Sequence, residues 1–502
     1  MINTELVRSE KELENIADLM SSELVNSGEN IISRYVRVFF DMKTFINGQS
    51  SEHRYTNSNF NKEDMRRGIY SLVTIDDLLL HNYKDICVAR DLQDHRFHFA
   101  SKEIPLPVVT ESRIDNMPLD ADMYDDELRE FTESHPNSRL KRTLSVQQKI
   151  VVNSGGGITI QSIPFLGISY SHGYNPIPTS RDINVVCSDD EVKRFPELIR
   201  FIADPTPEGR IRNAQSFTDA FHELYGISGL KYGSLENAGI PLSELYDVVM
   251  LTGVPVHEIF GHHFEEPIRF LDFGESATFK YGQNITNRNI ILSDNPNQSI
   301  AGFRPLGFSY FDAYGRKTQE RVHIKDGHVV GFLGSEYADP DKFKQFLNLE
   351  KSEYSGNAVQ DSDGMFPQPR MSCTVIDGKT ENVDLEGKIL VVSHEGHTQP
   401  QDKTYNVKAY ECYVVRDGVP RRIIPLQVTG GINQALANIA LLENQSYQTG
   451  VCGKPEPIYY PQSRGSAQVP VSQFAKDQLW KNQQVYPLPI SDNHLKVLHK
   501  KK

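Results

Sequence analysis

Three absences narrow what this chain of 502 residues can be. No run approaches the ~20 apolar residues of a membrane-spanning helix, and residues 1–10 lack the apolar stretch of a secretory signal. Cysteine is scarce and odd in number, five in all, which argues for reduced thiols rather than a disulfide framework. Lys and Arg number 53 against 66 Asp and Glu, and a net charge of −13 disfavours binding to phosphate-rich surfaces. We therefore expect a cytoplasmic protein that binds neither nucleic acid nor membrane.

The most chemical-looking stretch is His257-Glu258-Ile259-Phe260-Gly261-His262. Two imidazoles around a carboxylate suit a zinc hydrolase, in which ring nitrogens hold the ion and the carboxylate takes a proton from water. The histidines are five apart, so an ideal helix would leave them roughly 140° out of line. Either the helix contains a π-bulge, or it ends between them. Gly261 makes both routes easy, because it has no Cβ to clash.

The spacing alone is a weak signal, because a chain with this many histidines shows it by chance about one time in ten. The alternative is two ordinary histidines and a solvated Glu258 on a surface helix. Context favours the site, since Asp247–Leu251 reads as a short buried strand. Thr252 is a suitable cap for a following helix, whose first turn tolerates Pro255. We therefore expect an ordered strand-to-helix connection at the motif.

A catalytic zinc site normally has three protein ligands, which raises the question of a third. Three cysteines, Cys187, Cys373 and Cys412, sit in strand-like runs where a thiol is usually a small core residue, and Cys87 gives little information. Cys452 is different, because glycines flank it and Lys454 would favour its thiolate. Cys452 is the best candidate.

The overall pattern predicts an α+β fold with two domains, built of antiparallel sheets flanked by helices. We place the N-terminal domain at residues 1–230 and the C-terminal domain at residues 231–502. A polar, acidic insertion at about 105–142 is expected to be a loop carrying one short helix. Near the start, Ser9-x-x-Glu12 is a capping box, which predicts a helix with an apolar stripe. The members of that stripe are Leu13, Ile16, Ala17, Met20 and Leu24.

Later in the chain the signals are mainly those of strands. Asp-Gly pairs at 326–327, 377–378 and 417–418 each predict a hairpin, and together they favour an antiparallel sheet. Residues 158–170 alternate like a pair of strands. Residues 433–442 predict a helix leading into a loop that holds Cys452.

With these residues in view, the chain resembles the TldD/PmbA family of zinc metallopeptidases, in its metal-bearing, TldD-like branch. The resemblance rests on His257-Glu258-x-x-x-His262 with a trailing Glu265, on Ser355-Gly356-Asn357 followed by Pro369-Arg370-Met371, and on Gly450-x-Cys452-Gly453-Lys454. It implies one Zn²⁺ per chain, held by His257, His262 and Cys452, with Glu258 as general base. It also implies cleavage of unstructured peptides inside a closed dimer, either a homodimer or a heterodimer with a related subunit.

The sequence departs from the family pattern at three places, one of which is Glu266-Pro267 after the trailing Glu265. His263 stands where a small residue is usual, and a later stretch reads His394-Glu395-Gly396-His397 in place of Gly-Gly. These histidines are candidates for lining the cleft, or are polar residues at a loop tip. Glu265 is a candidate for orienting a ligand histidine. Possible peptide-contacting positions are Gly356, Asn357 and Arg370.

The sequence thus favours a zinc metallopeptidase in which Glu258 activates water and unstructured peptides are the substrates. Two alternatives remain open. One is a non-catalytic partner subunit, of the TldE/PmbA kind. The other is a metal-dependent enzyme that modifies peptides by another reaction.

Overall fold

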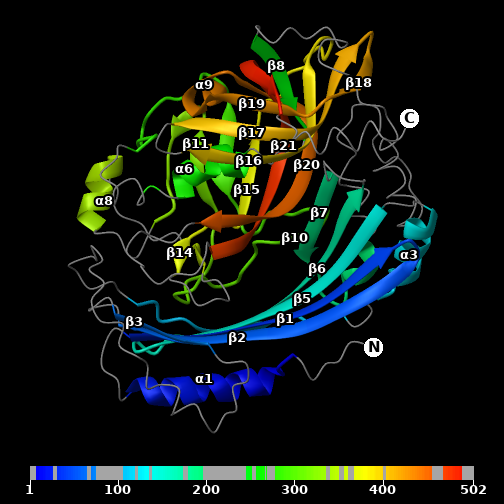
Figure 1. The fold of residues 1–502 in the computed structure, drawn as a ribbon. Coiled ribbons are helices and arrows are strands. Elements are labelled where there is room, and N and C mark those ends of the chain that lie inside the picture. The colour runs from blue at the N-terminus through cyan, green and yellow to red at the C-terminus, as the bar shows by residue number, and fades with distance from the viewer. Residues whose placement is uncertain are drawn as a thin grey trace.

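A computed structural model describes most of the chain (Figure 1). The described residues are 7–25, 31–64, 69–74, 106–118, 122–134, 138–172, 179–195, 245–251, 256–265, 267, 277–334, 340–349, 356–359, 367–399, 403–454 and 467–488. Cys87, Thr252, Pro255 and the expected domain boundary at residues 230–231 lie outside these ranges. None of the helices in these ranges is both long and apolar enough to cross a membrane.

The N-terminal part of the chain builds a long, curved sheet, called the first sheet, with the order β10-β7-β6-β5-β1-β2-β3 and with β4 paired in parallel to β6. Its strands are β1 (Ile31–Ile46), β2 (Gln49–Asp64), β3 (Ile69–Thr74), β4 (Thr110–Ile114), β5 (Ser138–Asn153), β6 (Ile158–His172), β7 (Thr179–Val186) and β10 (Arg304–Pro305). Because β10 comes from far along the chain, the two parts of the protein interlock at this edge.

Helix α1 (Glu10–Val25) covers one face of the first sheet (Figure 1). The predicted capping box is present: the Ser9 backbone N–H donates to Glu12 Oε2 at 2.8 Å, and the Glu12 N–H donates to Ser9 Oγ at 3.4 Å. All five residues of the predicted apolar stripe are buried and pack against β1, β5 and β6. The opposite face of the sheet looks toward the rest of the molecule.

The C-terminal part forms the second sheet, with the order β12-β11-β9-β15-β21-β19-β17-β16-β8. Its strands are β8 (Leu245–Met250), β9 (Ile290–Asp294), β11 (Arg321–Lys325), β12 (His328–Val329), β15 (Cys373–Gly378), β16 (Ile389–Gln399), β17 (Thr404–Arg416), β18 (Val419–Ile423), β19 (Leu426–Gly431), β20 (Ile439–Lys454) and β21 (Ala467–Pro487). Strand β8 pairs with both β16 and β21, so β21, β19, β17, β16 and β8 close into a ring. The α+β prediction is confirmed.

The remaining elements are short. They are α3 (Asp125–Ser134), η3 (Val192–Arg194), the π-helix η5 (Val256–Gly261), α6 (His262–Glu265), α8 (Pro340–Leu347), α9 (Ile432–Ala437), and a two-stranded sheet of β13 (Ala358–Val359) and β14 (Gln368–Pro369). Of these, η5 and α6 follow β8 in the chain after five intervening residues. The motif therefore stands at a strand-to-helix connection, as the sequence predicted.

The two sheets share one buried core and several hydrogen bonds. Apolar side chains of β5, β6 and β7 pack in one cluster with Cys373, Tyr447 and Phe474 of the second sheet. The Tyr447 hydroxyl donates to the Asn184 carbonyl oxygen at 2.6 Å, and the Asn184 side-chain amide donates to Thr449 Oγ1 at 3.0 Å. Strand β20, which carries Cys452, therefore rests on strand β7 of the first sheet.

Two predictions about the N-terminal part need correction. Residues 158–170 form one strand, β6, rather than a pair. Gly167 looks like a turn residue, but a Cβ there would lie 1.5 Å from Asn184 Oδ1, so this glycine serves a close approach between strands. The stretch at about 105–142 holds the expected helix, α3, together with strand β4 and the start of β5.

Two predictions about the C-terminal part also need correction. The Asp-Gly pairs at 326–327 and 417–418 do form hairpins, whereas Gly378 ends β15, where a Cβ would lie 2.2 Å from the Asn289 carbonyl oxygen. The predicted helix 433–442 stops at Ala437, and β20 begins at Ile439. Its first residues are buried on both faces of the strand, so their continuous apolar run gave a helix-like pattern. Cys452 consequently lies in a strand, not a loop.

Candidate metal centre

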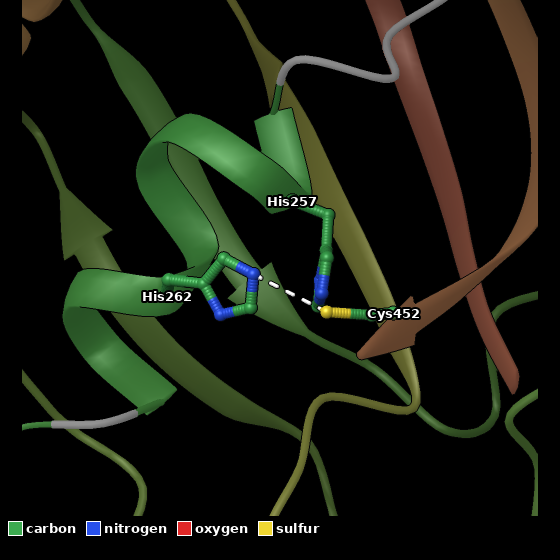
Figure 2. Close-up of side chains that lie close together, drawn as sticks. All are labelled: His257, His262 and Cys452. Carbon is green, nitrogen blue, oxygen red and sulfur yellow. Dashed lines mark hydrogen bonds between the residues drawn. The ribbon is translucent and has the colours of Figure 1, made fainter. Parts of the chain in front are cut away.

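His257, His262 and Cys452 meet in space although 190 positions separate the last two (Figure 2). The two histidines project from η5 and α6, and Cys452 projects from β20 toward both rings. One ligand atom from each residue lies within 4.8 Å of the others. Cys452 Sγ is 3.3 Å from His262 Nε2, and the two ring centroids are 4.8 Å apart. The structure thus assembles a group of metal-ligand type.

The π-helix explains how histidines five positions apart face one partner. Hydrogen bonding from residue i to i+5 makes a wider turn than an α-helix, so side chains five apart fall on the same side. The structure has this turn at Val256–Gly261, which is the first of the two alternatives that the spacing left open. Gly261 is needed for close packing, because a Cβ there would lie 2.9 Å from Met371 Sδ.

His257 is buried, and its ring orientation is set by hydrogen bonds. Its Nδ1 lies 2.9 Å from Thr374 Oγ1, whose own hydroxyl donates to Met371 Sδ at 3.1 Å. The Thr374 oxygen must therefore accept from His257 Nδ1–H, which leaves the lone pair on Nε2. Gln473 Oε1 holds the His257 backbone N–H at 3.0 Å.

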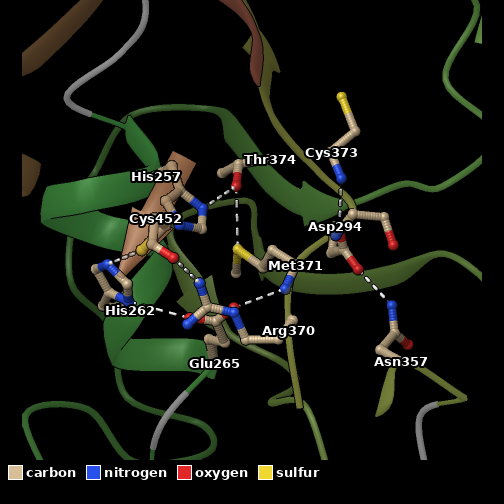
Figure 3. Close-up of polar contacts among 11 residues, drawn as sticks. His257, His262, Glu265, Asp294, Asn357, Arg370, Met371, Cys373, Thr374 and Cys452 are labelled. Carbon is tan, nitrogen blue, oxygen red and sulfur yellow. Dashed lines mark hydrogen bonds and ion pairs between the residues drawn. The ribbon is translucent and has the colours of Figure 1, made fainter. Parts of the chain in front are cut away.

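His262 is fixed in the same way by a carboxylate. Its Nδ1 lies 3.0 Å from Glu265 Oε2, so the Nδ1 proton faces Glu265 and the lone pair is again on Nε2. Glu265 is fully buried, accepts the Met371 backbone N–H at 2.7 Å, and lies 3.5 Å from Arg370 Nε (Figure 3). Glu265 therefore fixes the orientation of the His262 ring.

Cys452 is in an environment that favours its thiolate. Burial by itself would raise the pKa of this thiol, but the charge of His262 when it is protonated, together with the neighbouring His257 ring, outweighs burial and lowers the pKa to about 6. By contrast, burial raises the pKa of Cys187 and Cys373 well above the ordinary value of a thiol. Those two cysteines and Cys412 are fully buried core residues, as the sequence predicted.

These residues fit a zinc ion on three grounds. His257 Nε2, which carries the lone pair of the ring, is buried and has no hydrogen-bond partner among the described residues. Tetrahedral zinc would place a thiolate sulfur and an imidazole nitrogen about 3.5 Å apart, close to the 3.3 Å between Cys452 and His262. Two nitrogens and one thiolate are also donors that zinc prefers over magnesium or calcium.

The structure places the other candidate residues differently. His263 is buried and packs edge-on against Phe279, with centroids 5.7 Å apart, so it does not line an open cleft. Asn357 and Arg370 are also buried and bond within the protein, behind the ligands rather than on a surface that a peptide reaches. A Cβ on Gly356 would lie 2.5 Å from the Lys317 carbonyl oxygen. Peptide contact at these positions stays a prediction.

His394 and His397 lie within strand β16, paired with Ala409 and Asn406 of β17, and not at a loop tip. The run 389–399 continues as one strand because its partner β17 is long enough to pair with all of it. The side chains of these two histidines, and that of Glu258, lie outside what the structure describes.

Sequence reasoning missed three residues that support the site, Thr374, Gln473 and Asp294. Thr374 and Gln473 come from β15 and β21, which bond to the ligand residues only after the sheet has formed. Asp294 ends β9 and contacts the backbone behind the ligands. No local spacing joins any of them to the motif, so no sequence signal was available.

The fold and the cluster together define a two-sheet α+β protein with a His-His-Cys centre built on a π-helix. Residues 246–473 match the family model described as the PmbA/TldA metallopeptidase C-terminal domain. The C-terminal part of the chain therefore carries this domain, which confirms the resemblance to the TldD/PmbA family seen in the sequence. This match covers β8, the histidine motif, Arg370 and Cys452.

Solved structures share the fold over nearly the whole chain. TldE from Thermococcus kodakarensis is 14% identical with a TM-score of 0.60, covering 94% of this chain and 99% of its own. A proposed modulator of a DNA gyrase from Thermotoga maritima is 14% identical with a TM-score of 0.58, covering 95% and 100%. A proposed modulator of DNA gyrase from Bacteroides thetaiotaomicron is 11% identical with a TM-score of 0.59, covering 97% and 100%. At these identities the likeness concerns the fold alone. No curated protein matches the chain.

Proposed function

We propose that this protein is a zinc-dependent metallopeptidase that hydrolyses unstructured peptides, with zinc held by His257, His262 and Cys452. The observation that carries the proposal is the convergence of two Nε2 lone pairs and one acidified thiol. A metal-free partner subunit would have no need for the hydrogen bonds that fix both ring tautomers. The metallopeptidase description of the matching domain supports the same reaction class.

In this proposal the zinc ion, when bound, supplies Lewis acidity toward water and the peptide carbonyl. Glu258 follows a ligand histidine directly, and we assign it to take the proton from the attacking water and to pass it to the leaving amine. Thr374 and Glu265 keep the Nδ1 protons of the histidines away from the centre. The His262 side chain is 12% exposed, whereas His257 is fully buried, so a substrate would approach from the His262 side.

The proposal includes a cytoplasmic location and a dimer, formed with a second copy or with a related subunit. Cys187, Cys373, Cys412 and Cys452 are free thiols, which suits a reducing compartment. A ligand thiol in particular must stay reduced to bind a metal.

The test compares Glu258→Gln with the unaltered protein, using bound zinc and cleavage of an unstructured peptide as the two readouts. We expect the variant to keep its zinc and to lose cleavage, because glutamine cannot take the proton. Cleavage at the original rate would refute the assignment of Glu258. Mass spectrometry of the products separates hydrolysis, which adds one water, from peptide modification.

A further inference from the structure

One short segment supports all three residues of the His-His-Cys centre. This support segment, Arg370–Thr374, runs behind the centre as β15 begins (Figure 3). Thr374 Oγ1 accepts a hydrogen bond from His257. The Met371 N–H donates to Glu265, whose other carboxylate oxygen bonds to His262. Arg370 Nη2 donates to the Cys452 carbonyl oxygen at 3.0 Å. The three ligands come from two distant parts of the chain, and the support segment is what they have in common.

Asp294 in turn fixes the support segment. Its Oδ1 accepts the backbone N–H groups of Ser372 at 2.6 Å and Cys373 at 2.9 Å, and the Asn357 side-chain amide donates to its Oδ2. Asp294 and Arg370 are both fully buried. Asp294 of β9 is also the strand partner of Thr374 in β15. The Asn357 carbonyl oxygen also accepts the Arg370 N–H at 3.0 Å. Asn357 thus holds the start of the support segment, and Asp294 holds the rest of it.

We propose that Asp294 is a positioning residue for the metal centre: through the support segment it sets the relative placement of His257, His262 and Cys452. The inference rests on the proposed function and adds a residue that touches none of the ligands.

Burial of a carboxyl group is costly unless its oxygens are bonded. An uncharged residue could end strand β9 without this cost. At this position, however, one oxygen must accept two adjacent N–H groups while the other meets Asn357. Asparagine keeps the doubly accepting oxygen, and the Asn357 amide can rotate to present its own oxygen. Alanine removes the acceptor altogether and frees the support segment.

The experiment measures zinc affinity of the folded protein by competition with a chelator, together with the thiolate-to-metal absorption band after loading with Co²⁺. We expect Asp294→Ala to weaken zinc binding by about 10-fold or more, which is typical when an outer partner of metal ligands is lost, and to shift or weaken the cobalt band. Asp294→Asn should restore most of both signals.

The control is Asp125→Ala. Asp125 is likewise a buried carboxylate, but its partners Arg142 and Lys43 lie in the first sheet. Its loss should lower the stability of the fold and leave zinc affinity and the cobalt band within about twofold of the unaltered protein. A role of Asp294 limited to folding predicts the same result for both variants.

Unchanged zinc affinity and an unchanged cobalt band in folded Asp294→Ala would overturn the inference and leave the proposed function intact. Absence of zinc from the unaltered protein would overturn both. Should Asp294→Ala not fold, Asn357→Leu replaces it, because it removes one bond to Asp294 and keeps the two backbone bonds. Asn357→Leu should also weaken zinc binding, and an unchanged zinc affinity in this variant would contradict the inference.

Discussion

Replacement of Glu265 by glutamine tests whether the tautomer of His262 controls metal binding. The Glu265 carboxylate accepts from His262 Nδ1 and from the Met371 N–H at the same time. Glutamine has one accepting oxygen, and its amide group is a donor. If the oxygen stays with Met371, the amide donates to His262 Nδ1, and the ring proton moves to Nε2, where the ligand lone pair is needed.

The expected magnitude follows from the contacts that are lost. Loss of an outer partner of a metal ligand typically weakens binding about 10–100-fold, or about 1.4–2.7 kcal/mol. The buried Arg370 also loses its carboxylate partner, which costs about 3–5 kcal/mol of folding free energy when a buried pair is broken. Glu265→Gln should therefore bind zinc more weakly and unfold at lower denaturant concentration.

The assay is zinc competition with a chelator, paired with denaturant unfolding of the metal-free protein. The double variant Glu265→Gln/Arg370→Met is the control, because it removes the buried charge whose carboxylate partner is lost, while the tautomer change remains. It should recover stability without recovering zinc affinity. Zinc affinity equal to that of the unaltered protein in Glu265→Gln would refute the reasoning about the His262 tautomer.

Three further predictions concern packing, pH and metal removal. Gly261→Ala should cost about 1–3 kcal/mol of stability by overpacking against Met371, whereas Gly450→Ala, with nothing within 4 Å of the added Cβ, should cost nothing; thermal unfolding of both variants checks this. Burial lowers the pKa of His323 to about 3, so over the pH range below about 6.5 the unfolded chain binds a proton that the folded chain does not. The free energy of unfolding should therefore fall as pH drops from about 6.5 toward 3. The same dependence of unfolding free energy on pH in His323→Leu would contradict this. Chelation should abolish peptide cleavage and zinc should restore it, whereas full activity in a zinc-free preparation would exclude the proposed mechanism.

Local signals in the sequence predicted the local parts of this structure. The capping box at Ser9 predicted α1, two Asp-Gly pairs predicted hairpins, and the five-residue spacing from His257 to His262 predicted either a π-bulge, which is present, or a helix end. Each of these depends on residues that are close along the chain, so the physics that decides them is visible in a short window.

The remaining features depend on contacts between distant strands. Gly378 was misread as a turn signal because the neighbour that requires a glycine there, Asn289, lies elsewhere in the chain. The close approach of Gly167 to Asn184 likewise depends on a neighbouring strand. Thr374 and Asp294 support the centre only after β15 has paired with β9. Cys452 was selected as a third ligand by its flanking glycines and Lys454 and then by family resemblance, since no local rule joins residues 190 positions apart.

The zinc content of purified protein, measured beside that of Cys452→Ala, tests the central claim most directly. The account predicts about one zinc per chain in the unaltered protein, and a large loss of zinc in the variant, because two imidazoles alone hold the ion far less tightly than two imidazoles and a thiolate. Equal zinc in the two proteins, or none in either, would contradict the claim that His257, His262 and Cys452 form one metal centre.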